Sequence, residues 1–364
     1  MKIVDGSLML YFCFDVADEI NIHILEKILG TQAEKAFLSR TTLVPEYLQY
    51  KSPPLLIKFG EEKLPGGLVS FAEAKIYEFG VVTIRFTSQI QGEMENLIGL
   101  NRFIQENNDI KNIAVKYLRE IIYAIKPSLI RPGTNPESDW EDYAIYWVHS
   151  FDEKVDSQLL LKNYGSCIAR IMRAEEQLSD SEIEDACKYH LSYYGDDLTL
   201  IDWSSAFLYD PRKTYEVIDV IEFAVIQLLE LRLYDSVLDR SIESAYDDLA
   251  AIRQRRIKVV MISSVLDRLS RMKLDISEVI DRLENYLKLI GDLYLAKVYQ
   301  AASSRFYLDR WKLAVREKLS VIESLYTKEW ERLQTSRMVI AEIAIVVLFV
   351  IDIILIFFEI IKTK

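Results

Sequence analysis

The feature that most constrains this chain is an apolar run near its C-terminus, AEIAIVVLFVIDIILIFFEII, residues 341–361. The run extends back to Met338, and a helix over 338–361 measures about 36 Å, against about 30 Å for the hydrocarbon core of a bilayer. A buried core helix is rarely apolar on all sides over such a length. The pattern therefore predicts a transmembrane helix over 338–361, which would be a single-pass C-terminal anchor.

Basic residues precede this segment at Lys328, Arg332 and Arg337. Because basic residues accumulate on the cytoplasmic side of a membrane helix, the N-terminal head is expected on the cytoplasmic (or equivalent) side. The membrane is therefore the first expected partner.

Acidic residues lie along the apolar run at Glu342, Asp352 and Glu359. Glu342 and Glu359 are near its ends, where a carboxylate reaches the headgroups. Asp352 is near the middle, where an ionised acid costs roughly 2.5 to 3.5 kcal/mol. Because Asp352 and Glu359 are seven apart and share a face, we expect that face to meet protein in a homo-oligomer. A lone anchor with a protonated Asp352 is the alternative.

The charge and the cysteine pattern exclude some function classes. A net charge of −12 argues against a nucleic-acid partner, because phosphate backbones attract cationic surfaces. The three cysteines have no CxxC spacing and the three histidines lie far apart. We therefore expect reduced thiols, no metal and no cofactor.

The second half of the chain lacks helix breakers. All eight prolines lie at or before Pro211, and Gly291 is the one glycine after Gly195. This composition predicts helix nearly throughout from Lys213. Apolar residues at alternating spacings of four and three predict a coiled-coil seam at Ile276, Ile280, Leu283, Leu287, Ile290 and Tyr294. The seam suits an oligomer interface or packing within the chain.

The first half mixes strand and helix patterns. SLMLYFCFDVA predicts a strand, and AEAKIYEFGVVTIRFTS predicts a hairpin about Gly80. The order strand, helix, hairpin and helix recurs after residue 141, with a second hairpin about Gly195. We therefore predict an α+β head of two ferredoxin-like units, with a single domain as the alternative. The predicted boundaries are 1–126 for the first unit, 127–140 for a linker, 141–250 for the second unit, 251–337 for an all-α coiled-coil stalk and 338–361 for the transmembrane helix.

Chemistry-bearing motifs are scarce. No P-loop, Rossmann fingerprint or nucleophile elbow appears. The most enzyme-like stretch is GDDLTLIDWSSAFLYD, whose carboxylates suit acid–base work or Mg²⁺ at Asp196, Asp197, Asp202 and Asp210. Period two divides these acids between the faces of a strand, and Gly195-Asp196 is also turn chemistry. We therefore expect no catalytic residues.

Two stretches resemble a family named for its requirement in meiotic nuclear division, which carries a domain of unknown function. They are the hairpin turn Phe79-Gly80-Val81-Val82 and the C-terminal WERLQTSRMVIAEIAIVVLF. The chain departs from the family pattern at Arg85, where an aromatic residue is usual, and Asp352 has no counterpart. The resemblance implies an oligomeric, membrane-tethered protein without catalytic activity.

These observations lead to one functional hypothesis and two alternatives. The leading hypothesis is a tail-anchored, self-associating membrane scaffold that presents an acidic α+β head to other proteins. The first alternative is an enzyme or a nucleotide- or Mg²⁺-binding head that uses the hairpin over 196–210. The second is an oligomeric pore or ion-coupled assembly lined by Asp352.

Overall fold

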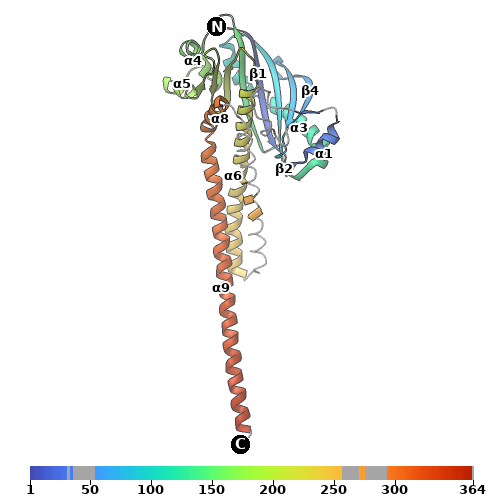
Figure 1. Ribbon diagram of the computed structural model, residues 1–364, viewed down its shortest axis with the longest axis vertical. Coiled ribbons are helices and arrows are strands. Elements are labelled where there is room, and N and C mark those ends of the chain that lie inside the picture. The colour runs from blue at the N-terminus through green and yellow to red at the C-terminus, as the bar shows by residue number, and fades with distance from the viewer. Residues whose placement is uncertain are drawn as a thin grey trace. The chain divides into compact units, whose positions relative to one another are not determined.

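The computed structural model describes residues 1–30, 33–35, 54–255, 270, 271, 273, 274, 277 and 293–362 (Figure 1). The chain divides into two compact units. The first comprises Met1–Leu233 and Glu278–Lys312, and the second comprises Tyr234–Ser277 and Leu313–Lys364. The domain boundaries predicted from sequence stay a prediction.

A mixed sheet organises the first unit. Within the described residues it has nine strands in the order β3-β4-β5-β6-β1-β8-β11-β10-β9, and β2 and β7 form a separate antiparallel pair. Neighbouring strands are antiparallel except β11, which runs parallel to β8. The strands are β1 Lys2–Asp15, β2 Ala17–Ile20, β3 Ala33–Lys35, β4 Leu55–Lys63, β5 Val69–Ile76, β6 Val81–Glu93, β7 Leu129–Pro132, β8 Trp140–Phe151, β9 His190–Leu191, β10 Leu198–Ile201 and β11 Ser205–Tyr209.

The prediction of two ferredoxin-like units is wrong, because both predicted halves contribute to this one sheet. Strand β1 pairs with β6 on one side and with β8 on the other, so Tyr11 lies opposite both Arg85 and Tyr143. The recurring order of elements in the sequence reflects local strand and turn patterns. It carries no information about which strands pair across 130 residues.

Helices connect and cover the strands. The five that occur before Asp197 are α1 Ile22–Leu29, α2 Asn96–Glu106, α3 Asn108–Ile125, α4 Ser157–Arg173 and α5 Asp180–Ala186. The later ones in the described part of the chain are α6 Glu216–Arg255, α8 Leu293–Arg305 and α9 Leu308–Lys362. The described part of the first unit also contains two short 3-10 helices, η3 Pro65–Gly67 and η4 Lys126–Ser128.

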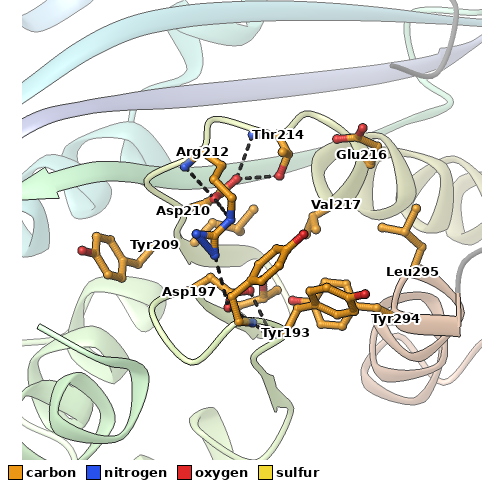
Figure 2. Close-up of a pocket in the computed structure, with 13 residues that line it drawn as sticks. Tyr193, Asp197, Tyr209, Asp210, Arg212, Thr214, Glu216, Val217, Tyr294 and Leu295 are labelled. Carbon is orange, nitrogen blue, oxygen red and sulfur yellow. Dashed lines mark hydrogen bonds and ion pairs between the residues drawn. The ribbon is translucent and has the colours of Figure 1, made fainter. Parts of the chain in front are cut away.

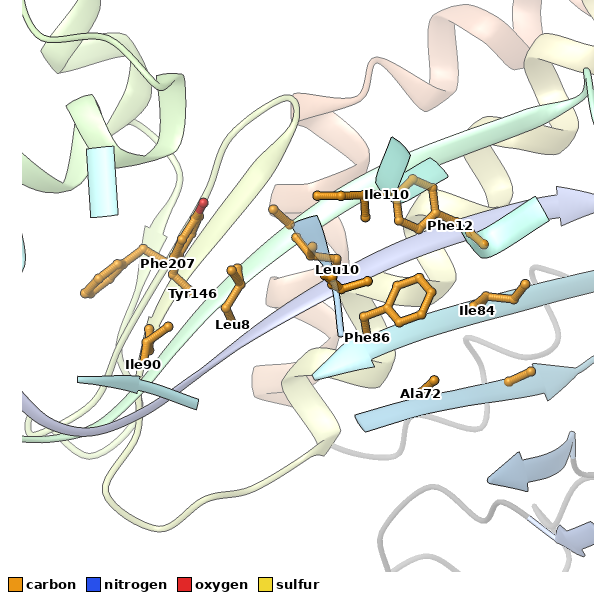
Figure 3. Packing of buried hydrophobic residues seen from close by; sticks show 14 of the residues in the cluster. Leu8, Leu10, Phe12, Ala72, Ile84, Phe86, Ile90, Ile110, Tyr146 and Phe207 are labelled. Atoms are coloured by element: carbon orange, nitrogen blue, oxygen red, sulfur yellow. The ribbon is translucent and has the colours of Figure 1, made fainter. Parts of the chain in front are cut away.

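One face of the sheet carries the main hydrophobic core. Side chains alternate along a strand, so Leu8, Leu10 and Phe12 of β1 all point to this face. They pack with Phe86 of β6 and Ile110 of α3 (Figure 3). Helices α2 and α3 lie against β6, and α4 lies against β11. Burial of this face is the main term that holds the sheet to its first helical layer.

The opposite face packs against α6 and α8 and contains a buried ionic cluster. Lys75 Nζ of β5 lies 2.6 Å from Glu222 and 2.8 Å from Asp219 of α6. Glu222 also accepts hydrogen bonds from the Tyr77 hydroxyl at 2.8 Å and from Thr83 Oγ1 at 2.7 Å. These bonds fix α6 across β5 and β6, because each partner is far from water.

The predicted hairpin about Gly80 is confirmed. The Tyr77 backbone N–H donates to the Val81 carbonyl at 2.9 Å, and β5 and β6 pair in register from there. Gly80 has φ +93°, and a Cβ at this position would lie 1.6 Å from the Ala17 carbonyl oxygen. The turn therefore requires glycine.

The predicted coiled-coil seam falls almost wholly outside the described residues, which exclude Ile276, Ile280, Leu283, Leu287 and Ile290. Tyr294 is described, and it lies in the first turn of α8. There its ring contacts Tyr193 of the first unit, with ring centroids 5.2 Å apart.

The prediction of a membrane span over 338–361 is wrong. Among the residues that the structure describes, no helix contains a stretch long and apolar enough to cross a bilayer. The tail anchor, its orientation, the membrane partner and the homo-oligomer built on it are withdrawn.

Candidate functional site

A pocket in the first unit collects residues from two loops, two helices and the strands β10 and β11 (Figure 2). One loop joins β9 to β10, the other joins β11 to α6, and the first turns of α6 and α8 close the sides. The lining residues are Tyr193, Tyr194, Asp197, Thr199, Leu208, Tyr209, Asp210, Arg212, Thr214, Glu216, Val217, Tyr294 and Leu295.

Asp197 shapes the first loop. Its carboxylate accepts hydrogen bonds from the Tyr193 backbone N–H at 3.0 Å and the Tyr194 backbone N–H at 2.6 Å. Gly195 has φ +83°, which lets the chain reverse between those tyrosines and Asp197. The hairpin predicted about Gly195 is confirmed by the antiparallel pairing of β9 with β10. The side chain of Asp197 thus folds the loop that presents both tyrosines.

Asp210 shapes the second loop in a similar way. One carboxylate oxygen accepts from the Arg212 backbone N–H at 2.9 Å. The other accepts from the Thr214 backbone N–H at 2.8 Å and from its hydroxyl at 2.6 Å. The loop ends at Glu216, where α6 begins, so Asp210 fixes the direction in which that helix leaves the sheet.

Arg212 links the two loops. Its guanidinium donates two hydrogen bonds to Asp196, at 2.6 and 3.1 Å, and its Cζ lies 3.9 Å from the centroid of the Tyr194 ring. Asp197 lies 3.9 Å from Nη2, which also donates to Asp196, and Asp210 lies 3.9 Å from Nε. Three of the four acids singled out in the sequence therefore surround one cation.

Tyrosine rings form the apolar part of the wall. Tyr193 meets Tyr194 edge to face at 4.5 Å and Tyr294 at 5.2 Å. Burial raises the pKa of Tyr294 to about 12 despite a hydrogen bond with Thr199, which favours the ionised form. Tyr294 is thus a neutral phenol across the physiological range, and it contributes to the pocket wall.

Pocket size limits what can enter. The cavity measures about 130 Å³, close to the engineered 150 Å³ cavity that accepts benzene and well below the 300 to 1,000 Å³ of most ligand pockets. A nucleotide is too large to be enclosed. In the part of the chain that the structure describes, no group of three or more His, Cys, Asp and Glu side chains is placed to hold a metal ion. The described residues therefore give no support to the nucleotide- or Mg²⁺-binding alternative for the 196–210 hairpin.

Asp202, the fourth predicted acid, lies at the other end of β10. Its carboxylate accepts from Arg173 Nε at 2.9 Å and pairs with Arg305 of α8. Asp185 also pairs with Arg305, at 2.9 Å. Asp202 is 3% exposed, whereas the Asp185 side chain is 48% exposed, so the cluster joins α4, α5 and α8 and reaches the surface on the Asp185 side.

The acids predicted to act in the membrane are not brought into any site. Glu342 is solvent-exposed on α9, and the side chains of Asp352 and Glu359 lie outside the described residues. The pore alternative depended on a membrane span, and it is withdrawn with that span.

Sequence reasoning missed Arg212 and the tyrosines. The signal for Arg212 was its place directly after Asp210-Pro211, in a turn that faces the acidic Gly195-Asp196-Asp197 turn. Tyr193 and Tyr194 adjoin that same turn, and Tyr294 was assigned to a coiled-coil seam.

Fold and site together define a class: an α+β protein with a mixed sheet between two helical layers and a tyrosine-lined pocket at one end of β10 and β11. Residues 5–216 match the family described as "Uncharacterized protein MJ0711, N-terminal domain", and the chain belongs to that family. It is 24% identical to "Uncharacterized protein MJ0711" of Methanocaldococcus jannaschii over 311 residues, which cover 79% of this chain and 94% of that protein. No solved structure gave a significant match.

This membership corrects the resemblance to the meiotic-nuclear-division family. The hairpin motif Phe79-Gly80-Val81-Val82 misled because its glycine is a requirement of the turn, where a Cβ would collide with Ala17. Short motifs fixed by turn geometry arise in unrelated sheets, and they do not identify a family. The matched segment contains every strand of the sheet and both pocket loops, whereas Tyr294 lies beyond it.

Proposed function

We propose that this protein is a ligand-binding protein whose pocket takes one small organic group against its tyrosine rings, and that it is not an enzyme. The observation that supports this proposal is the cavity of about 130 Å³ walled by Tyr193, Tyr194 and Tyr294. Flat aromatic walls with a few fixed polar groups are typical of sites that orient a small ligand.

The tyrosine wall is assembled from the β9–β10 loop and from α8, which are far apart in the sequence. This favours a binding role over an incidental hollow in the surface. Tyr193 lies 56% exposed and Tyr194 65% exposed, although each belongs to a loop fixed by buried hydrogen bonds to Asp197. Asp197 itself is 8% exposed. A rigid loop that holds aromatic rings toward solvent pays no ordering cost when a ligand arrives.

The carboxylates argue for binding without catalysis. Asp197 and Asp210 hold backbone N–H groups of their own loops, at distances of 2.6 to 3.1 Å. A general base must be free to approach and take a proton from the substrate. Moving either carboxylate for that purpose would release the loop that forms the pocket.

The test is a fragment titration followed by NMR on the full chain. The probes are methylguanidinium, N-methylurea and acetate, which share a size that fits the cavity and differ in charge. We expect at least one probe to shift tyrosine-ring resonances saturably and to be recovered unchanged after prolonged incubation.

A matched pair of variants locates the binding. Tyr294→Leu removes a wall ring, and we expect binding weaker by roughly two- to thirteenfold in Kd, because an aromatic contact of this kind contributes about 0.5 to 1.5 kcal/mol. Tyr123→Leu, at an α3 tyrosine that is 87% exposed, should leave Kd unchanged. Absence of saturable binding for all three probes, or equal effects of the two substitutions, contradicts the proposal.

A further inference from the structure

We infer that the group this pocket takes is an organic cation of the guanidinium or alkylammonium type, and that Arg212 occupies the cation's place when the pocket is empty. The inference rests on the proposed function. It adds the charge of the ligand and names Arg212 as the group that competes with the ligand for the pocket.

The first support is that the pocket rim already holds a guanidinium. Arg212 forms a bidentate pair with Asp196, and its Cζ lies 3.9 Å from the Tyr194 ring centroid. A planar cation between a carboxylate and an aromatic face satisfies both its hydrogen bonds and its cation–π contact. Figure 2 shows the Arg212 side chain between the Asp197 and Asp210 sides of the pocket.

The second support is the balance of charge around the cavity. Asp197, Asp210 and Glu216 line it, and Arg212 is the basic residue among the lining residues. Lys213 points elsewhere, since its Nζ lies 2.6 Å from Asp5. A ligand cation entering here meets an excess of negative charge, and an anion is repelled.

The third support is that Arg212 is held weakly enough to be displaced. Its side chain is 33% exposed and that of Asp196 is 55% exposed. The Arg305–Asp202 pair of the same unit is 8% and 4% exposed. Ion pairs in water contribute little, whereas breaking a buried pair is strongly unfavourable. Arg305 is therefore a fixed structural group, and Arg212 is an exchangeable one.

The size of the competition follows from these contacts. The exposed ion pair and the exposed cation–π contact together favour the conformation in which Arg212 lies at the pocket rim. They favour it by a factor of roughly 3 to 30 over the conformation in which Arg212 has moved away. A ligand that binds only when Arg212 has moved away has its apparent affinity lowered by the same factor. Removing the Arg212 cation should therefore tighten binding of a ligand cation three- to thirtyfold.

The experiment compares methylguanidinium with N-methylurea and acetate by NMR titration of the full chain. N-Methylurea has nearly the same shape as methylguanidinium and no charge. We expect methylguanidinium to bind at least tenfold more tightly than either other probe. Arg212→Gln should tighten methylguanidinium binding three- to thirtyfold. Arg119→Gln, which removes an arginine in a comparable exposed bidentate pair with Glu137, should change nothing.

Each outcome separates the inference from the proposed function. Binding of N-methylurea or acetate in preference to methylguanidinium overturns the cation class and leaves a ligand pocket in place. No binding of any probe overturns both. Weaker methylguanidinium binding by Arg212→Gln, in a variant with an unchanged thermal midpoint, overturns the displacement.

A second variant tests the displacement if Arg212→Gln does not fold. Arg212→Lys keeps a cation beside the loop acids but loses the bidentate fork to Asp196, so a ligand cation should displace it more easily than Arg212. Tighter methylguanidinium binding supports displacement, and unchanged or weaker binding refutes it.

Discussion

Replacing Lys75 with Met removes the cation from the buried cluster beneath α6. Glu222 and Asp219 lie 2.6 and 2.8 Å from its Nζ, and their side chains are 1% and 15% exposed. Burial lowers the pKa of Lys75, but the two acids outweigh that effect and hold it well above its ordinary value. Lys75 is therefore charged in the folded protein, and Met leaves two carboxylates in the interior without it.

The expected cost of Lys75→Met is about 3 to 5 kcal/mol in the free energy of unfolding, the range for breaking one side of a buried ion pair. Glu222 retains its hydrogen bonds from Tyr77 and Thr83, which favours the lower end of that range. The variant should recover part of the loss at acidic pH, where protonation removes the uncompensated charge.

Urea unfolding followed by tryptophan fluorescence measures this cost, because Trp147 lies buried on the same face of the sheet. Lys63→Met is the matched control, since Lys63 ends the neighbouring strand β4 and is exposed, and it should cost less than about 0.5 kcal/mol. A Lys75→Met cost below about 1 kcal/mol, or one that does not shrink at low pH, refutes the reasoning.

Three further perturbations test other parts of the fold. Gly80→Ala should destabilise by more than about 3 kcal/mol in urea unfolding, because its Cβ would lie 1.6 Å from the Ala17 carbonyl oxygen. Burial, with Asp18 and Asp139 nearby, raises the pKa of Asp15 to about 7. Folding therefore favours the protonated form of Asp15. The stabilisation that this group contributes is fully present below about pH 4 and is lost as the pH rises to 7. Asp15→Asn should therefore gain about 2 to 3 kcal/mol relative to the wild type between pH 5 and pH 8. Arg305→Met should lower the thermal midpoint by several degrees, since it breaks the buried pair with Asp202.

Each of these predictions has a control and a contrary result. Gly99→Ala is the control for Gly80→Ala. Gly99 lies in an exposed turn of α2 and has no atom within 4 Å of an added Cβ, so this substitution should stabilise the protein by about 0.5 to 1 kcal/mol. Equal effects of the two glycine substitutions contradict the steric argument. A pH-independent difference between Asp15→Asn and the wild type contradicts the raised pKa. For Arg305→Met, a midpoint shift no larger than that of Arg119→Gln contradicts the buried-pair argument.

Local patterns in the sequence predicted the two hairpins because their causes are local. Gly80 and Gly195 both need positive φ, and strand-forming residues flank each turn. These preferences are readable from a window of about ten residues.

Strand pairing and the site could not be predicted in the same way. Nothing in the sequence of β1 specifies that it lies between β6 and β8, because that register depends on contacts more than 60 residues apart. The candidate acids were identified, yet their partner Arg212 was not, since attraction between charges on two loops appears only once the loops are placed. Tyr294 was assigned to a seam because a helical stripe does not show which neighbour it faces.

The central place of β1 has a consequence for biosynthesis. This strand, Lys2–Asp15, leaves the ribosome before both of its partners, the second of which ends at Phe151. At 5 to 20 residues per second, about 7 to 30 s pass before that partner has been made. During this time one or both hydrogen-bonding edges of β1 are unpaired, and an unpaired edge is a template for pairing with another chain.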